Sequence, residues 1–395
     1  MGRAGEARRE MTRRLLIQNG LVAHEGGLEH WDVLCEDGEI AALGTRLCVD
    51  SAEVIDAAEM LVAPGFIDAH THLGLCEDSL DFEGDDTNED SEPITPQMRA
   101  LDGINPFDRC FSEARAAGIT TAAVAPGSAN PIGGQICVIK TVGKRVDSMV
   151  VKAPAAIKFA LGENPKSTYH SKNLAPVTRM ATAALIRETL YKAKRYAKEL
   201  SDAEDDEELD PPEFDIKSES LLPLIRGEIP AHFHAHRADD IFTAVRIAQE
   251  FGLKFVILHC TEGYLIADEL ARLGVPAVAG PNLCDRCKPE LRGQTFDNPR
   301  ILSDAGVKLA LTTDHPVTPL QYLPLCAEMA VRNGLDYEAA LRALTIQPAE
   351  ILGISDRVGS ISVGKDADFV LVEGDPLAGK VRAVFIDGQL VAGEL

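Results

Sequence analysis

Short apolar runs alternate with amphipathic runs through the middle of the chain. The segment after 239, for example, opens with aspartates as a helix cap, places Ile241, Val245 and Ala248 on one helix face, and ends at Gly252, which favours a left-handed stop. Strands alternating with such helices predict a parallel sheet, and eight of them predict a (β/α)8 TIM barrel, an α/β fold. An open doubly wound sheet is the alternative, but no glycine-rich phosphate loop opens its first unit. The eight predicted strands are 61–70, 119–126, 136–143, 155–162, 231–236, 254–259, 275–280 and 307–314.

The two ends of the chain have a different pattern. Asn19-Gly20, Asp37-Gly38 and Asp387-Gly388 each lie between short strand-like runs, as is typical of two-residue hairpin turns. We therefore expect both termini to be rich in strands and to pair into one small β-sandwich. The expected organisation is residues 1–60 and 356–395 in the sandwich and 61–355 in the barrel.

Charge and cysteine content narrow the function classes. The 395 residues include 39 Lys and Arg against 62 Asp and Glu, a formal net charge of -23. Such a field repels phosphate backbones and anionic membrane surfaces, so neither nucleic acid nor a membrane is an expected partner. The acidic run 201–215 is predicted to be a solvated insert. Nine scattered cysteines and the lack of a signal-peptide-like or membrane-spanning run favour reduced thiols in the cytoplasm.

Histidines, a lysine and an aspartate gather at the carboxyl ends of the predicted strands. The i, i+2 spacing of His70 and His72 directs both imidazoles to one point. One buried histidine alone is usually a satisfied core residue. Several converging at a barrel mouth indicate a divalent cation, with zinc as the first choice and manganese, iron or nickel as alternatives. The other groups are Lys158, His232, His234, His236, His259 and Asp314.

At this point the sequence resembles the amidohydrolase superfamily over nearly its whole length. "PGFIDAHTH" at 64–72 is similar to the first-strand motif of the family, and "GSISVGKDADFVLV" at 359–372 to the return of its chain into the sandwich. The resemblance is strongest to the imidazolonepropionase-like and peptidase-like branch. It implies a (β/α)8 metallohydrolase, and it carries the metal-ligand role onto His70, His72, His234, His259 and Asp314.

The resemblance leaves the number of metal ions open, at one or two. In two-metal members of the family a carboxylated lysine bridges the ions, and Lys158 matches that position. Glu163 is the competing bridging group. A third interpretation is that Lys158 is an unmodified lysine paired with a carboxylate. Strand alternation places His232, His234 and His236 on one face. We expect His232 to be deep and structural, and His236 to face substrate at the mouth.

The expected reaction is hydrolysis of a C–N bond in a small amide or cyclic amide by a metal-activated hydroxide. Asp314 would move the proton, and His259 or His236 would stabilise the oxyanion. Arg237, Arg286 and Arg292 follow strands five and seven, and one of them is expected to bind a carboxylate on the small-molecule substrate.

Three questions stay open at this stage. A deaminase of a ring amidine would need the same metal site, and a non-catalytic scaffold could keep the barrel. The long segment 76–106 is either a lid or a substrate wall. Members of the family often form dimers or larger assemblies, so the resemblance allows a homo-oligomer.

Overall fold

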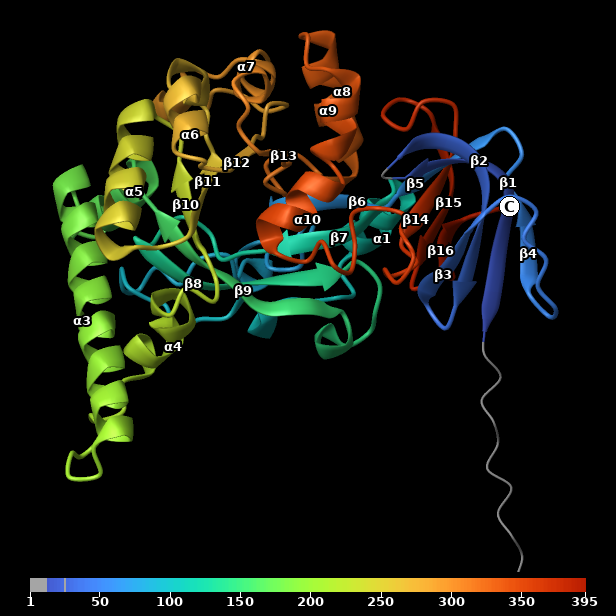
Figure 1. The fold of residues 1–395 in the computed structure, drawn as a ribbon. Helices are drawn as coiled ribbons and strands as arrows, with labels where there is room; N and C mark the ends of the chain where they lie inside the picture. Colours follow the sequence, from blue (N-terminus) through green and yellow to red (C-terminus); the bar gives the residue numbers. More distant parts are fainter. Residues whose placement is uncertain (1–12, 25) are drawn as a thin grey trace, which may run out of the picture.

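Eight strands form a nearly closed barrel in the computed structural model, which describes residues 13–24 and 26–395 (Figure 1). The sheet ends, β6 and β13, meet where Thr312 Oγ1 donates to the carbonyl oxygen of His70 at 2.6 Å. The predicted barrel is confirmed. In sheet order its strands are β13 (Leu309–Leu311), β12 (Ala277–Ala279), β11 (Phe255–His259), β10 (Ala231–Ala235), β9 (Val150–Ala160), β8 (Ile132–Lys140), β7 (Ile119–Val124) and β6 (Phe66–Thr71).

One barrel strand departs from the predicted alternation. β8 is antiparallel to both β7 and β9. The connections 125–131 and 141–149 contain no α-helix and are too short for the crossover that a parallel pair needs. The expectation of a fully parallel sheet is therefore wrong at β8, and the amino end of this strand lies at the edge of the barrel where its neighbours have their carboxyl ends.

Helices cover the outside of the barrel (Figure 1). They are α1 (Arg109–Ala116), α2 (Glu163–Ser171), α3 (Arg179–Asp205), α4 (Ile216–Ile225), α5 (Ala238–Phe251), α6 (Ala267–Arg272), α7 (Asn298–Asp304), α8 (Leu323–Arg332), α9 (Tyr337–Arg342) and α10 (Ile346–Leu352). The predicted left-handed stop of α5 is confirmed, since Gly252 has φ 67°.

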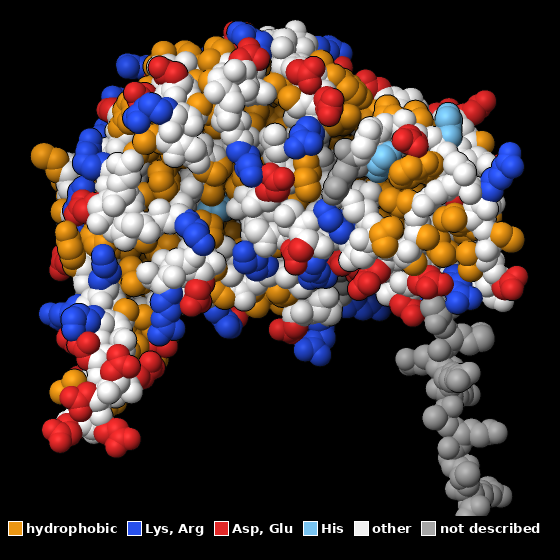
Figure 2. Space-filling view, in the orientation of Figure 1, with side chains coloured by type: hydrophobic (Ala, Val, Ile, Leu, Met, Phe, Trp, Pro, Cys, Tyr) orange, Lys and Arg blue, Asp and Glu red, His pale blue; other side chains and the backbone are white. Residues whose placement is uncertain are grey.

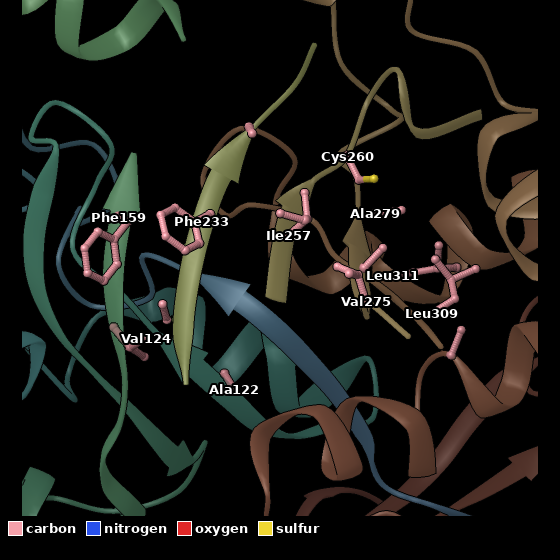
Figure 3. Close-up of a cluster of buried hydrophobic side chains, with 14 of the residues drawn as sticks. Ala122, Val124, Phe159, Phe233, Ile257, Cys260, Val275, Ala279, Leu309 and Leu311 are labelled. Carbon is pink, nitrogen blue, oxygen red and sulfur yellow. The ribbon is translucent and has the colours of Figure 1, made fainter. Parts of the chain in front are cut away.

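Alternate residues of the barrel strands contribute to two different apolar layers. Phe159, Phe233 and Ile257 belong to the layer between strands and helices, and Figure 3 shows the two phenyl rings side by side, with centroids 4.8 Å apart. Val256 and Leu258 belong to a second cluster that α10 closes from one end. Because side chains alternate along a strand, residues 158, 232 and 234 point to the inside of the barrel, and the fold therefore places polar groups there.

The second sheet combines strands from both ends of the chain (Figure 1, blue and red). The predicted strand 61–70 is divided at Gly65, so its first half belongs to this sheet and its second half to the barrel. The strands are β1 (Arg14–His24), β2 (Gly27–Glu36), β3 (Glu39–Gly44), β4 (Glu53–Asp56), β5 (Met60–Pro64), β14 (Phe369–Glu373), β15 (Lys380–Ile386) and β16 (Gln389–Gly393).

Two of the three predicted hairpin turns are confirmed. Asp37-Gly38 joins β2 to β3, and Asp387-Gly388 joins β15 to β16. Asn19-Gly20 was expected to be a turn, and this is wrong: both residues lie inside β1, where the register with β2 shifts and Asn19 has φ 62°. A left-handed Asn before Gly suits a bulge as well as a turn, so the dipeptide alone does not distinguish them.

The far end of the molecule from this sheet is acidic. α3 projects from the barrel, and Figure 2 shows acidic side chains gathered at its tip. The run 201–215 is mostly exposed, as predicted, although its first five residues continue the helix. Within residues 13–24 and 26–395, no helix is long and apolar enough to span a membrane.

A buried lysine ties the barrel to the terminal sheet. Lys140, at the end of β8, has its Nζ 2.6 Å from Asp366 and 3.1 Å from Asp368, and it also pairs with Asp387. Its side chain is 6% exposed. Burial lowers the pKa of Lys140, but Asp368, Asp366 and Asp387 raise it more, so the net pKa is above its usual value.

Replacing Lys140 by methionine is expected to lower the free energy of unfolding by about 3–5 kcal/mol, because the carboxylate of Asp368 is left buried without a counter-charge. In the wild type, the raised pKa makes the lysine's contribution complete below about pH 10.4 and lost as the pH rises through the folded value. Urea unfolding at neutral and alkaline pH measures both effects. Lys144→Met, at an exposed position, is the control; equal loss in the two variants would contradict the expectation.

Candidate metal centre

The first group of polar side chains joins the end of β6 to the loop after β13. It consists of His70, His72 and Asp314. Asp314 Oδ1 lies 3.3 Å from His70 Nε2 and 3.4 Å from His72 Nε2. His72 Nδ1 donates to the Ala125 carbonyl oxygen at 2.8 Å, which leaves its Nε2 lone pair facing Asp314. The predicted convergence of the two first-strand imidazoles is confirmed.

Backbone hydrogen bonds to Asp68 hold this group together. The Asp68 carboxylate accepts from the amides of His70 at 3.1 Å and Thr313 at 2.9 Å, and from Thr313 Oγ1 at 2.7 Å. One buried side chain therefore fixes β6 against the loop that carries Asp314. Asp314 itself has φ 51°, a left-handed conformation that is uncommon for a residue other than glycine.

The second group lies next to the first and consists of His234, His236 and His259, from β10, the residue after it and β11. The ring of His259 lies 4.4 Å from that of His234 and is stacked on that of His236 at 4.6 Å. His259 Nδ1 donates to the Gly280 carbonyl oxygen at 2.9 Å. His259 has φ 68°, so the backbone turns sharply at the strand end. Ring centroids 5.4 Å apart place His259 against His70 of the first group.

Lys158 of β9 lies inside the barrel, fully buried. Its Nζ is 3.1 Å from His70 Nε2, and burial lowers its pKa to about 7. His232 pairs with Lys158 in the register of β9 and β10 and is also fully buried, as the expectation of a deep position requires.

Burial keeps the histidines of the site neutral. It lowers the pKa of His232 to about 3 and that of His259 to about 4, and it lowers the pKa values of His70, His234 and His236 well below the usual range. Burial raises the pKa of Asp314, but His259, His70 and His72 lower it more, and the net value is well below the usual range. The site therefore offers neutral imidazoles and an ionised carboxylate, the protonation states that metal binding requires.

The site contains polar atoms that no protein group satisfies. Buried and without a hydrogen-bond partner are His70 Nδ1, His232 Nδ1 and Nε2, His234 Nδ1 and Nε2, His236 Nε2, His259 Nε2 and Asp314 Oδ1. Such groups are costly unless something binds them. Ligands at 2.0–2.1 Å from a tetrahedral zinc ion lie about 3.4 Å apart, close to the separations within the first group. These residues fit a divalent cation.

A cavity of about 420 Å³ is lined in part by Glu290, whose Oε1 lies 3.6 Å from His236 Nε2 of the second group. Its charged and titratable lining consists of Glu163, Lys166, His170, Arg179, Arg237 and Glu290. Two residues predicted from the sequence, Glu163 and Arg237, line this cavity. The other two arginines are elsewhere: Arg286 lines a separate hollow and donates to the Gln294 carbonyl oxygen, and Arg292 is exposed.

Sequence reasoning missed Glu290. Its side chain is 1% exposed, and Oε1 lies 3.6 Å from His236 Nε2, 3.8 Å from His234 Nε2 and 2.8 Å from Lys288 Nζ. The residue follows β12 in "CDRCKPEL", a loop without periodicity. A glutamate two residues after a lysine in such a loop has no pattern that would have separated it from solvated carboxylates.

The long segment 76–106 is a wall beside the mouth. Asn130 Nδ2 donates to the carbonyl oxygens of Glu89 and Glu92 and to Thr95 Oγ1. The buried Tyr169 donates to the Glu92 carbonyl oxygen at 2.6 Å. These bonds tie the segment to the loop after β7 and to α2, which favours the wall over the lid.

A solved structure decides the family. The crystal structure of an amidohydrolase from Thermotoga maritima MSB8 has 42% sequence identity and a TM-score of 0.93, over 96% of this chain and 100% of that one. The chain belongs to the amidohydrolase family. The sequence profile of the Amidohydrolase family matches residues 225–391 of this amidohydrolase.

Two curated relatives agree with this assignment. Amidohydrolase tasK of Hapsidospora irregularis is 31% identical over 391 residues, 90% of this chain; the chain spans 39% of the length of that relative. The imidazolonepropionase of Acidiphilium cryptum is 27% identical over 395 residues, 91% of this chain and 90% of the relative. This amidohydrolase is an enzyme that hydrolyses C–N bonds, which sets the scaffold alternative aside.

Proposed function

We propose that this amidohydrolase is a metal-dependent hydrolase of a small amide or cyclic amide. The observation that carries the proposal is Asp314 Oδ1 within 3.4 Å of two first-strand imidazole nitrogens. His70, His72 and Asp314 would hold one cation, with Lys158 Nζ beside it. His234 and His259 belong to the neighbouring group. Imidazole with carboxylate suits zinc, and manganese, iron or nickel would fit the same donors.

Asp314 is the proton carrier of the proposed reaction. A bound divalent cation lowers the pKa of a coordinated water and polarises a carbonyl group. The ionised Asp314 carboxylate can accept the proton of the attacking water and pass it to the leaving nitrogen. His259 lies next to it, with Nδ1 3.9 Å from Asp314 Oδ2. Because the Nδ1 hydrogen of His259 is directed to Gly280, this ring keeps a fixed orientation beside the carboxylate.

The imidazolonepropionase relative supports the cyclic-amide substrate class. The test is to incubate the metal-loaded protein with a panel of five- and six-membered cyclic amides, N-acyl amino acids and dipeptides, and to measure new carboxylate and free ammonia separately. We expect carboxylate to form without ammonia from at least one ring or acyl amide. Ammonia from a ring amidine would indicate the deaminase, and no turnover of any amide would contradict the proposal.

Arg237 is the proposed anion-binding residue. Arg237→Met is expected to raise the KM for a carboxylate-bearing substrate at least about 10-fold with little change in kcat, because a charge-assisted hydrogen bond to a remote carboxylate stabilises ground and transition states alike. The guanidinium lines the 420 Å³ cavity, and Asp239 orients it through bonds of 2.8 and 2.9 Å. Steady-state kinetics with the carboxylate substrate and its neutral amide measure the effect.

Arg286→Met and Arg292→Met are the matched controls, because neither arginine lines that cavity. Their KM values should stay within about 2-fold of the wild type. An unchanged KM in Arg237→Met would remove the proposed anion site, and so would an equal change for the neutral amide.

A further inference from the structure

We propose that a second divalent cation binds in a site completed by His236 and Glu290, so that His234, His236, His259 and Glu290 are its four ligands. This inference rests on the proposed metal-dependent function. It assigns to His236 a ligand role in place of the substrate-facing role expected from the sequence. It also adds Glu290, which the sequence did not mark.

His236 is prepared for metal binding in the same way as His259. Its Nδ1 lies 2.7 Å from Thr261 Oγ1, which can accept the ring hydrogen, as the Gly280 carbonyl oxygen does for His259. Both rings then present Nε2 as a lone pair, and both Nε2 atoms are buried without a partner. The two rings are nearly parallel, with an interplanar angle of 18°. A metal-binding histidine usually donates the hydrogen of its other ring nitrogen to a neighbouring acceptor, which fixes the orientation of the ring.

Glu290 is held as a ligating carboxylate would be. Its Oε2 accepts the backbone amide of Glu163 at 3.0 Å. Its Oε1 faces His234 and His236 and pairs with Lys288 at 2.8 Å, and Lys288 in turn donates to Asn164 Oδ1 at 3.1 Å. Hydrogen bonds of this kind orient carboxylates around metals. They also explain why a carboxylate is buried beside neutral imidazoles.

The spacing of the four groups suits one small cation. The three imidazoles offer ligand atoms within 4.8 Å of one another, and Glu290 Oε1 is 3.6 and 3.8 Å from two of them. Tetrahedral zinc needs separations of about 3.4 Å, so Glu290 Oε1 would move by a few tenths of an ångström, and imidazole nitrogens that lie up to 4.8 Å apart would move by more. Without a cation, both ring nitrogens of His234 and the Nε2 atoms of His236 and His259 stay buried without a partner.

This ligand set makes a carboxylated Lys158 unnecessary for the second cation. The Nζ of Lys158 contacts His70 Nε2, a member of the first group. The four proposed ligands already complete a tetrahedral site without it. The proposal therefore keeps Lys158 as an unmodified amine beside His70 of the first group.

Metal binding by the full-length protein tests this without a substrate. The protein is stripped with chelator and titrated with Co²⁺ alone, following the visible absorption of the ion and its content after dialysis. We expect the wild type to bind about two ions, and Glu290→Gln and His236→Asn to bind the second at least about 10-fold more weakly while they keep the first. Lys158→Met should keep the second ion. Glu338→Gln, at an exposed position of α9, is the matched control.

Each outcome decides between specific alternatives. Loss of the second ion in Lys158→Met but not in Glu290→Gln would overturn the proposal in favour of a bridging carboxylated lysine. Two ions of unchanged affinity in both Glu290→Gln and His236→Asn would also overturn it, as would a single ion in the wild type. No ion in the wild type would instead contradict the proposed function itself. If Glu290→Gln fails to fold because Lys288 is left unpaired, the double variant Glu290→Gln, Lys288→Met removes that charge, with Lys288→Met as its control.

Discussion

Asp314→Asn is expected to lower kcat/KM by roughly 10³–10⁴-fold, at the upper end of what a positioned general base contributes. The amide is nearly isosteric but cannot accept the proton of the attacking water. The substitution also removes the negative charge of Asp314, whose Oδ1 lies 3.3 Å from His70 Nε2 and 3.4 Å from His72 Nε2. Kinetics on the best substrate of the amide panel, with the metal content of each preparation, measure the effect.

The control for this substitution is Asp285→Asn, at an exposed position in the loop after β12. It should leave kcat/KM within about 2-fold of the wild type. If Asp314→Asn retained more than about a tenth of the wild-type kcat/KM with a full complement of metal, Asp314 would not be the proton carrier.

Removing the metal is expected to abolish hydrolysis to below about 1% of the loaded rate, because neutral water is then the only nucleophile. It should also lower the free energy of unfolding by about 4 kcal/mol relative to protein in a 1,000-fold excess of metal over Kd. The buried histidines explain the second effect, because the Nε2 atoms of His234, His236 and His259 have no hydrogen-bond partner in the protein once the metal is removed. Turnover and thermal unfolding, measured before chelation, after it and after addition of Zn²⁺ or Mn²⁺, test both.

His30→Asn, on an exposed part of the terminal sheet, should respond to chelation as the wild type does. His72→Asn should lose most of the stabilisation by metal, since one ligand of the first group is missing. Full activity in the chelated protein, with no bound ion detected, would contradict a metal-dependent mechanism.

The barrel was predictable because apolar runs of strand length recur with helical segments between them. The exceptions have local causes. β8 is antiparallel because its two connections are too short for a crossover, and the apolar pattern of a buried strand is the same in either direction. The run 61–70 looks continuous in the sequence, but Gly65 lets the chain pass from the terminal sheet into the barrel. Ideal Cβ geometry at Gly65 would place that atom 2.2 Å from Thr120 Oγ1, so no other residue fits there without a shift.

The site was predictable where it follows from strand ends. His70, His72, His234, His259 and Asp314 converge because carboxyl ends of neighbouring parallel strands share one edge of the barrel. Loop residues follow no such rule. Glu290 reaches the histidines from the loop after β12, whereas Arg286 and Arg292 of the same loop do not line the cavity beside them. Only the folded loop distinguishes these three.

The most direct test of the central claim is the number of metal ions per chain, measured by elemental analysis of protein purified without added chelator or metal. The two proposed sites predict about two divalent ions per chain. A content of about one ion would be consistent with the metal-dependent hydrolase but would contradict the proposed second site. No bound ion, even after reconstitution with Zn²⁺, Mn²⁺, Fe²⁺ or Ni²⁺, would contradict the metal-dependent hydrolase.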